Sequence, residues 1–243
     1  MRRLAAAVVL GVSLAAALGG CTTPEPDPSD PSDPSDPSEA RVSSTPGAPT
    51  GAALHRAVAD DDAAAVATAL HEGAAVDARD ADGRTPLLAA TRQGSAGLAR
   101  LLLEAGADPD AQDRLQDSAF LYAGAEGLDD ILRLTLEHGA DVTSTNRFGG
   151  TALIPASEHG HVSTVRILLD AGVPVDHVND LSWTALHEAI VLGDGSADQV
   201  EVVRLLLDAG ADPTVRDGQG VLPRDLAASR GYDAIVAELD RGR

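Results

Sequence analysis

The sequence predicts an all-α solenoid, a row of stacked helix pairs, and two observations carry that prediction. A similar pattern recurs every 33 residues after about residue 50, with one longer spacing of 38 near the end. Glycines recur at two fixed places in the units. A unit of this size cannot bury its apolar face alone, so neighbouring units must stack. The units start at Ala52, Thr85, Ser118, Thr151, Thr184 and Leu222.

The glycines divide each unit into two helices. One series stands nine residues after the unit start, where the first unit has Asp61 instead. A second series follows apolar runs such as Arg100–Leu103. A glycine just past an apolar helical stretch supplies the left-handed residue that ends a helix. Each unit therefore reads as helix, glycine turn, helix and glycine stop, followed by a short polar stretch. The two series are Gly94, Gly127, Gly160, Gly193 and Gly231, and Gly73, Gly106, Gly139, Gly172 and Gly210.

Individual residues refine this pattern. Thr85 fits a helix N-cap and Pro86 the first helical position. Pro155 falls inside the first helix of its unit, where it removes a backbone donor, so we expect a local distortion there. The five extra residues of the long unit lie near Asp194–Gln199, which places them in the turn between its two helices. Loops accommodate such additions at little cost in free energy.

Three segments resemble ankyrin repeats closely, namely Thr85–Leu87, Thr184–Ala189 and Leu205–Pro213. The resemblance covers about residues 51–243. It implies antiparallel helix pairs stacked side by side, with a β-hairpin finger projecting between units, and a chain that presents a surface for protein–protein interaction. It implies about six repeats, with the first and last as caps. The expected units are about 51–80, 81–113, 114–146, 147–179, 180–217 and 218–243.

The middle of the chain also resembles a group of single-domain bacterial ankyrin-repeat proteins. The stretches Asp117–Gly127 and Asn146–Ala156 carry this likeness. No settled biochemical activity comes with that group, so the role of the surface has to be read from its residues.

The N-terminus predicts export. Arg2 and Arg3 precede an apolar run from Leu4 to Leu18, which is typical of a secretory signal over residues 1–20 and too short for a membrane span. Leu18–Cys21 resembles a bacterial lipobox, which implies cleavage before Cys21 and lipid attachment to it. The alternative is an ordinary signal cysteine that is lost with the peptide. We expect a protein anchored by lipid to the cell membrane or envelope, with its domain outside the cytoplasm.

Residues 22–50 predict a disordered linker. Asp27–Ser29 recurs as a short repeat through Ser38, and the segment has too few apolar residues to bury a core. At ~3.1 Å per residue it reaches roughly 90 Å when fully extended. We interpret it as a tether, with a binding role for the Pro-Ser-Asp repeat as the alternative.

The charge of the chain narrows the class of partner. The net charge is −20 and every basic residue is an arginine. Such a chain repels phosphate backbones and anionic lipid headgroups, so we expect no nucleic acid and no membrane contact other than the lipid. A partner with a basic surface is favoured. A salty habitat or a biased genome would explain the same composition.

Two sets of residues are candidates for binding that partner. Three residues before successive unit starts stand Leu115, Phe148 and Leu181, and Trp183 stands one before. We predict an apolar ridge at these finger tips, and the alternative is that each tip packs on the next finger. On the first helices, Tyr122, Glu126, Glu158 and Glu188 predict an acidic groove for an Arg- or Lys-bearing segment, and the alternative is a solvated acidic face.

Catalytic and metal signals are weak. His159 and His161 flank a glycine beside Glu158, but the chain has one cysteine and no zinc-like spacing of ligands. A phosphate-binding glycine loop and a nucleophile elbow are also missing from the sequence. We therefore expect a monomeric scaffold with no enzyme activity, cofactor or metal. The alternative function is a binder of small cationic ligands or metal ions in the acidic groove.

Overall fold

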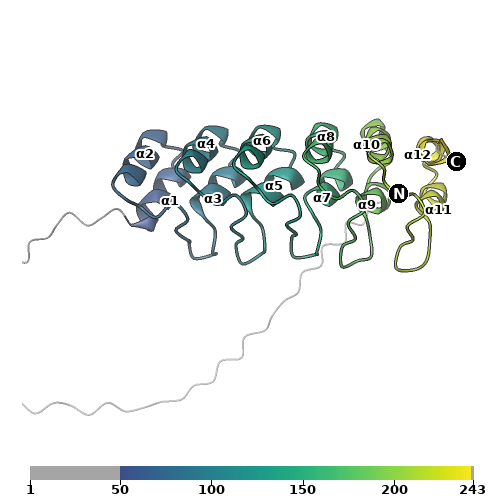
Figure 1. The fold of residues 1–243 in the computed structure, drawn as a ribbon, viewed down its shortest axis with the longest axis horizontal. Helices are drawn as coiled ribbons and strands as arrows, with labels where there is room; N and C mark the ends of the chain where they lie inside the picture. The colour runs from purple at the N-terminus through teal and green to yellow at the C-terminus, as the bar shows by residue number, and fades with distance from the viewer. Residues whose placement is uncertain (1–49, 242–243) are drawn as a thin grey trace, which may run out of the picture. The chain divides into compact units, whose positions relative to one another are not determined.

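The structure is a computed structural model that describes residues 50–241. These residues form six consecutive helix pairs, and Figure 1 shows the first helices in one layer, the second helices in another, and loops projecting from the first layer. The predicted solenoid is therefore confirmed. The first helices are α1 (Gly51–Ala59), α3 (Pro86–Arg92), α5 (Ala119–Ala125), α7 (Leu153–Glu158), α9 (Ala185–Val191) and α11 (Pro223–Ser229). The second helices are α2 (Ala63–His71), α4 (Ala96–Glu104), α6 (Asp129–Glu137), α8 (Val162–Asp170), α10 (Ala197–Asp208) and α12 (Asp233–Asp240).

The helix ends follow the residues that predicted them. The Thr85 hydroxyl accepts a hydrogen bond from the Leu88 N–H (3.2 Å), with Pro86 as the first residue of α3. Thr184 and His187 form a reciprocal capping box at the start of α9. Gly106, just past α4, has a φ of 89°, which only glycine adopts without strain. Local sequence and helix boundary therefore agree.

One continuous apolar core runs along the stack between the two layers. Leu54 stands near its start and Leu239 near its end, both buried. Phe120 is the largest side chain that is fully buried. Small side chains such as Ala152 let neighbouring first helices approach, since a Cβ on Gly124 would come within 2.8 Å of the Ala152 Cβ. Each unit buries its apolar face only against its neighbours, as expected for a solenoid.

The fingers project as expected, but they contain no β-strand among residues 50–241. Each is a tight turn that begins at an Asp or Asn. The Asn179 Oδ1, for example, accepts from the N–H groups of Leu181 and Trp183 (3.0 Å each), and the Asn179 N–H donates to the Trp183 carbonyl (2.9 Å). Because the turn closes within five residues, from Asn179 to Trp183, the finger is too short to form a β-ladder. The equivalent first residues are Asp80, Asp113, Asn146, Asn179 and Asp217.

Pro155 distorts the first turn of its helix, as predicted. The helix α7 begins two residues after the unit start, at Leu153, whereas α5 and α9 begin one residue after theirs. Because Pro155 has no N–H, the Thr151 carbonyl accepts from the Ile154 N–H instead (3.1 Å). The Thr151 hydroxyl is buried without a hydrogen-bond partner. The start of α7 therefore lacks the side-chain cap that α3, α5 and α9 have.

The prediction that the five-residue insertion lies in the turn between two helices is wrong in part. Helix α10 has 12 residues, whereas α4 has 9, so the insertion lengthens the helix as well as the turn. Ser196 caps the lengthened helix by accepting from the Gln199 N–H (3.4 Å), which lets the extra residues continue the helical hydrogen bonds. The finger after α10 keeps the turn of the other fingers.

The predicted signal segment, Cys21 and the linker up to residue 49 lie outside the described residues. In the part of the chain that is described, no helix combines the length and the apolar character needed to cross a bilayer.

Candidate functional site

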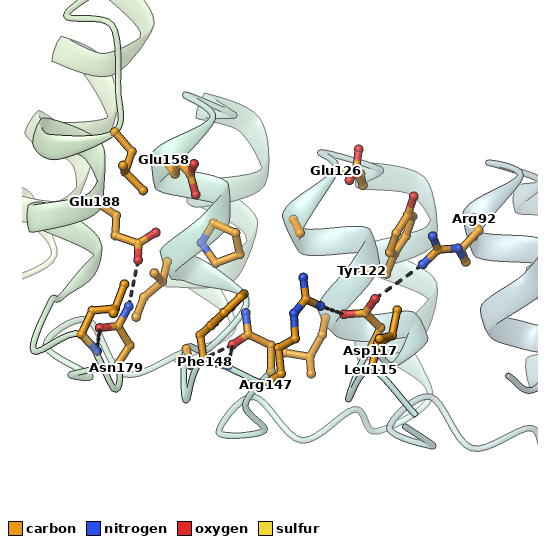
Figure 2. A pocket seen from close by; sticks show the side chains of 18 residues that line it. Arg92, Leu115, Asp117, Tyr122, Glu126, Arg147, Phe148, Glu158, Asn179 and Glu188 are labelled. Carbon is orange, nitrogen blue, oxygen red and sulfur yellow. Dashed lines mark hydrogen bonds and ion pairs between the residues drawn. The ribbon is translucent and has the colours of Figure 1, made fainter. Parts of the chain in front are cut away.

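A groove of about 540 Å³ runs across the concave side of three consecutive repeats. Finger residues form one edge of it, and the first helices α5, α7 and α9 form the floor (Figure 2). The ridge and the acidic face that the sequence predicted separately therefore line one and the same groove. The predicted residues that line it are Leu115, Phe148, Leu181, Tyr122, Glu126, Glu158 and Glu188.

Trp183 is the predicted residue that the structure places elsewhere. It is half-buried and is not among the residues that line the groove. Its backbone closes the finger turn through both N–H and carbonyl contacts to Asn179. Trp183 is therefore less exposed than Leu115, Phe148 and Leu181 and does not share the groove with them.

The exposed large apolar side chains of the described residues gather at this groove. Leu115 is 55% exposed, Phe148 51%, Leu181 52% and Leu192 49%, and all four line it. Val178, 48% exposed, is the remaining member of that set and lies outside the groove lining. Scattered apolar residues are normal on a protein surface, but contiguous ones mark binding surfaces. Their gathering in one concavity singles the groove out.

One end of the groove holds two arginines that stack on aromatic rings. The Arg92 guanidinium lies 4.6 Å from the centre of the Tyr122 ring, and that of Arg147 lies 4.7 Å from the Phe148 ring. Asp117 stands between them, 3.5 Å from each (Figure 2). Burial raises the pKa of Asp117, aided by the nearby carboxylate of Asp113, and this outweighs the two arginines. The stacking and the shared carboxylate hold both guanidinium groups in place.

The other end holds two carboxyl groups, Glu158 and Glu188, that pair with no arginine of the described residues. Glu188 is only 6% exposed, and its Oε1 accepts a hydrogen bond from the Asn179 Nδ2 (2.8 Å). The pKa of Glu188 is raised to about 7, mainly by burial and also by the charge of Glu158 and a hydrogen bond with its side chain, while Asn179 and His159 act in the opposite direction. Among residues 50–241, neither Glu158 nor Glu188 makes an ion pair with an arginine or histidine.

The groove is thus acidic at one end rather than throughout. Arg92 and Arg147 both pair with Asp117, while Glu158 and Glu188 pair with no arginine of the described residues. The sequence did not predict three residues that set this division of charge along the groove, namely Arg147, Asp117 and Asn179. A signal for Asn179 does exist in the sequence, since the first finger residue changes from Asp to Asn at Asn146 and Asn179 only.

The histidines near the groove serve structure in this arrangement. His159 Nδ1 lies 3.0 Å from the Ala125 carbonyl, and its ring is 5.5 Å from that of His161. Burial lowers the pKa of His161. His187 Nδ1 contacts the Thr184 hydroxyl at 2.9 Å, but this pair is buried within the cap of α9. In the described residues no group of three or more possible ligands converges on a point where a metal ion could sit.

Most of the chain matches a known protein family. The family model "Ankyrin repeats (3 copies)" matches residues 46–113 and 120–217. The chain is 47% identical over 51 residues to YahD of Escherichia coli (strain K12), whose name describes it as an ankyrin repeat protein. That match spans 21% of this chain and 25% of the length of YahD.

Solved structures agree over most of the chain. An ankyrin repeat domain from Acinetobacter baumannii AYE is 53% identical with a TM-score of 0.75, covering 76% of this chain and 95% of that one. The ankyrin repeat protein EF0377 is 38% identical with a TM-score of 0.76, covering 79% of this chain and 98% of that one. Domains of this type are generally scaffolds for protein–protein interaction and typically not enzymes. The chain belongs to the ankyrin repeat family.

Proposed function

We propose that this protein is a lipid-anchored scaffold outside the cytoplasm that binds a partner protein through the groove across α5, α7 and α9. One observation carries the proposal. Four large apolar side chains, each about half exposed, line a single concave surface. Interface cores combine such apolar area with aromatic and arginine side chains, and the groove holds both.

The groove is also held ready for binding. The two cation–π pairs and the shared Asp117 fix the side chains at one end, and Asn179 fixes Glu188 at the other. A rigid surface loses little conformational entropy when it binds, which favours affinity. The repeat stack behind it supplies this rigidity.

The placement outside the cytoplasm rests on the N-terminal residues. Arg2, Arg3 and the apolar run before Cys21 fit an exported lipoprotein, and the linker to residue 50 gives the domain a reach of roughly 90 Å from its anchor. Cys21→Ala should abolish labelling by a radioactive fatty acid and, because cleavage also depends on Cys21, leave the signal segment attached. Unchanged labelling and unchanged mass of the mature protein would contradict the anchor.

The binding role is tested by crosslinking the full chain in an envelope fraction. Phe148→Ala with Leu181→Ala should abolish capture of the partner, because both side chains lie in the groove and are about half exposed. The matched control is Val178→Ala, which removes an equally exposed apolar side chain outside the groove. Loss of the partner with the control as well, or its retention by the double variant, would contradict this site.

A further inference from the structure

The acidic end of the groove is chemically different from the rest of it. Glu158 and Glu188 come from the adjacent helices α7 and α9 and meet with no arginine between them. The side chains of Phe148 and Leu181, each about half exposed, line the same groove, and so does Leu192, one helical turn after Glu188. Among the described residues, the carboxyl groups there have no arginine to pair with, and nothing covers the exposed part of the apolar side chains. A ligand with one cationic and one apolar group would interact with both.

We propose that the groove binds an extended segment of a partner protein in which a basic side chain, Arg or Lys, stands next to an apolar one. The cation lies between the Glu158 and Glu188 carboxylates, and the apolar side chain lies on Phe148 and Leu181. This inference deepens the proposed function and rests on it. It follows from the division of charge along the groove, because both arginines pair with Asp117 at one end and neither pairs with Glu158 or Glu188 at the other.

Glu188 is an acid at a position that is only 6% exposed. The groups that face Glu188 are Glu158 and His159 from the preceding repeat and Asn179 from its own finger. Asn179 holds one carboxylate oxygen at 2.8 Å and leaves the group aimed at the groove. A buried carboxylate without a cation is costly, and a partner's cation removes that cost.

Uptake of the cation then expels a proton. Without a partner, burial and the Glu158 charge keep Glu188 about half protonated near pH 7. A bound cation favours the ionised form, so the proton leaves on binding. Affinity therefore rises with pH, by about tenfold between pH 6 and pH 8, since the ionised fraction of a group with this pKa rises by that factor.

Other occupants fit the charges less well. The linker at residues 22–50 carries six acids and one arginine, so it has the same sign of charge as the acidic end. A second copy of the chain, with a net charge of −20, is also repelled. A partner segment with a basic residue is complementary.

The experiment is a selection of random dodecapeptides displayed on phage against the purified full chain. We expect enriched peptides to share an Arg or Lys next to a large apolar residue. Selection against Glu158→Gln/Glu188→Gln should enrich apolar peptides without the basic residue. The control variant Glu126→Gln, which removes a groove acid at the arginine end, should leave the basic residue enriched.

The outcomes separate this inference from the proposed function. A peptide depends on the groove if it no longer binds Phe148→Ala/Leu181→Ala. Groove-dependent peptides without a basic residue would overturn the inference but keep the groove as a binding site. Peptides that bind all variants equally, or no enrichment at all, would overturn both. Agmatine, which carries a guanidinium group and no peptide, is the probe for a small-ligand site. Binding of agmatine as tight as that of the selected peptide would overturn the peptide occupant.

Proton release is measured on the selected peptide by titration calorimetry at pH 7 in two buffers of different ionisation enthalpy. We expect release of about 0.5 proton per peptide, the protonated fraction of a group whose pKa is about 7. Glu188→Gln should abolish the release, while its amide oxygen can still accept from Asn179. Equal release by wild type and Glu188→Gln would overturn the role of Glu188.

Discussion

Two neighbouring segments of the stack share a finger but differ in the helix that follows. Both fingers begin with asparagine, Asn146 before α7 and Asn179 before α9, and both Oδ1 atoms accept from the N–H groups two and four residues later. At the fifth position from the unit start, α7 has Pro155 and α9 has Glu188. Pro155 shortens helix α7, whereas Glu188 places a buried carboxyl group in α9.

Different atoms of the same side chain set the finger turn and the groove chemistry. The Oδ1 atom builds the turn in every finger, whether the residue is Asp or Asn. The Nδ2 atom of Asn179 is then free to hold Glu188, whereas that of Asn146 makes no hydrogen bond with another described residue. A single position can thus change the groove without changing the fold.

The largest expected effect is the pH dependence of stability that Glu188 confers. Its folded pKa of about 7 lies above the ordinary value of 4.5, so the folded state holds a proton that the unfolded state releases. Stability therefore falls as pH rises from 4.5 to 7 and levels off above, by about 3 kcal/mol in total. Urea denaturation of wild type and Glu188→Gln between pH 5 and pH 8 checks this. The free energy of unfolding of Glu188→Gln should rise relative to that of wild type as the pH rises. A difference that does not change with pH would contradict the raised pKa of Glu188.

Replacing each asparagine by aspartate should have different effects in the two segments. Asn179→Asp keeps the finger turn but places a second carboxylate against Glu188, so we expect a loss of about 2 kcal/mol at pH 8 and less at pH 5. Asn146→Asp makes the same change opposite Pro155 and should cost below about 0.5 kcal/mol. Equal losses in the two variants, measured by urea denaturation, would show that the amide acts through the turn alone.

Pro155 in α7 and Pro86 in α3 should respond to replacement by alanine with opposite sign. Pro155→Ala restores an N–H for the Thr151 carbonyl and allows the buried Thr151 hydroxyl to cap α7, so we expect a gain of about 1 kcal/mol. Pro86→Ala frees the unfolded chain at a position that suits proline, so we expect a loss of about 0.5 kcal/mol. Thermal denaturation of both variants checks the signs. Destabilisation by Pro155→Ala would mean that the short α7 is needed by its neighbours.

The arginine end should show the smallest effect. Arg92 and Arg147 lie 3.5 Å from Asp117 and are partly exposed, so salt screens them. Replacing either by Gln should change the free energy of unfolding by about 0.5 kcal/mol or less, and the change should shrink in 1 M NaCl. A larger, salt-independent change would place the stabilisation in stacking on Tyr122 and Phe148.

The sequence predicted the stack and most of the groove for a physical reason. A fixed period places equivalent residues on one face, so Leu115, Phe148 and Leu181 had to fall on one edge and Tyr122 and Glu188 on one floor. What it did not predict depends on how far side chains reach. Arg147 lines the groove, where it stacks on Phe148 and pairs with Asp117, and the burial of Glu188 depends on how α7 and α9 approach.

Trp183 and the insertion were predicted less well because periodicity says nothing about local packing. Trp183 stands one residue before a unit start, yet its backbone closes the finger and leaves the indole half-buried outside the groove. The insertion has a good cap in Ser196, so part of it continues α10 rather than forming loop. Both outcomes were decided by hydrogen bonds between nearby residues.

The longer turn between α9 and α10 is covered by the last unit of the stack. The Tyr232 hydroxyl donates to the Gly193 carbonyl (3.0 Å), and a Cβ on Gly195 would come within 2.6 Å of the Tyr232 ring. Terminal units of a repeat array open most readily, because they have a neighbour on one side only. Each opening of α11 and α12 therefore uncovers this turn as well, so amide exchange and protease cleavage near Gly193 follow the rate at which the end of the stack frays.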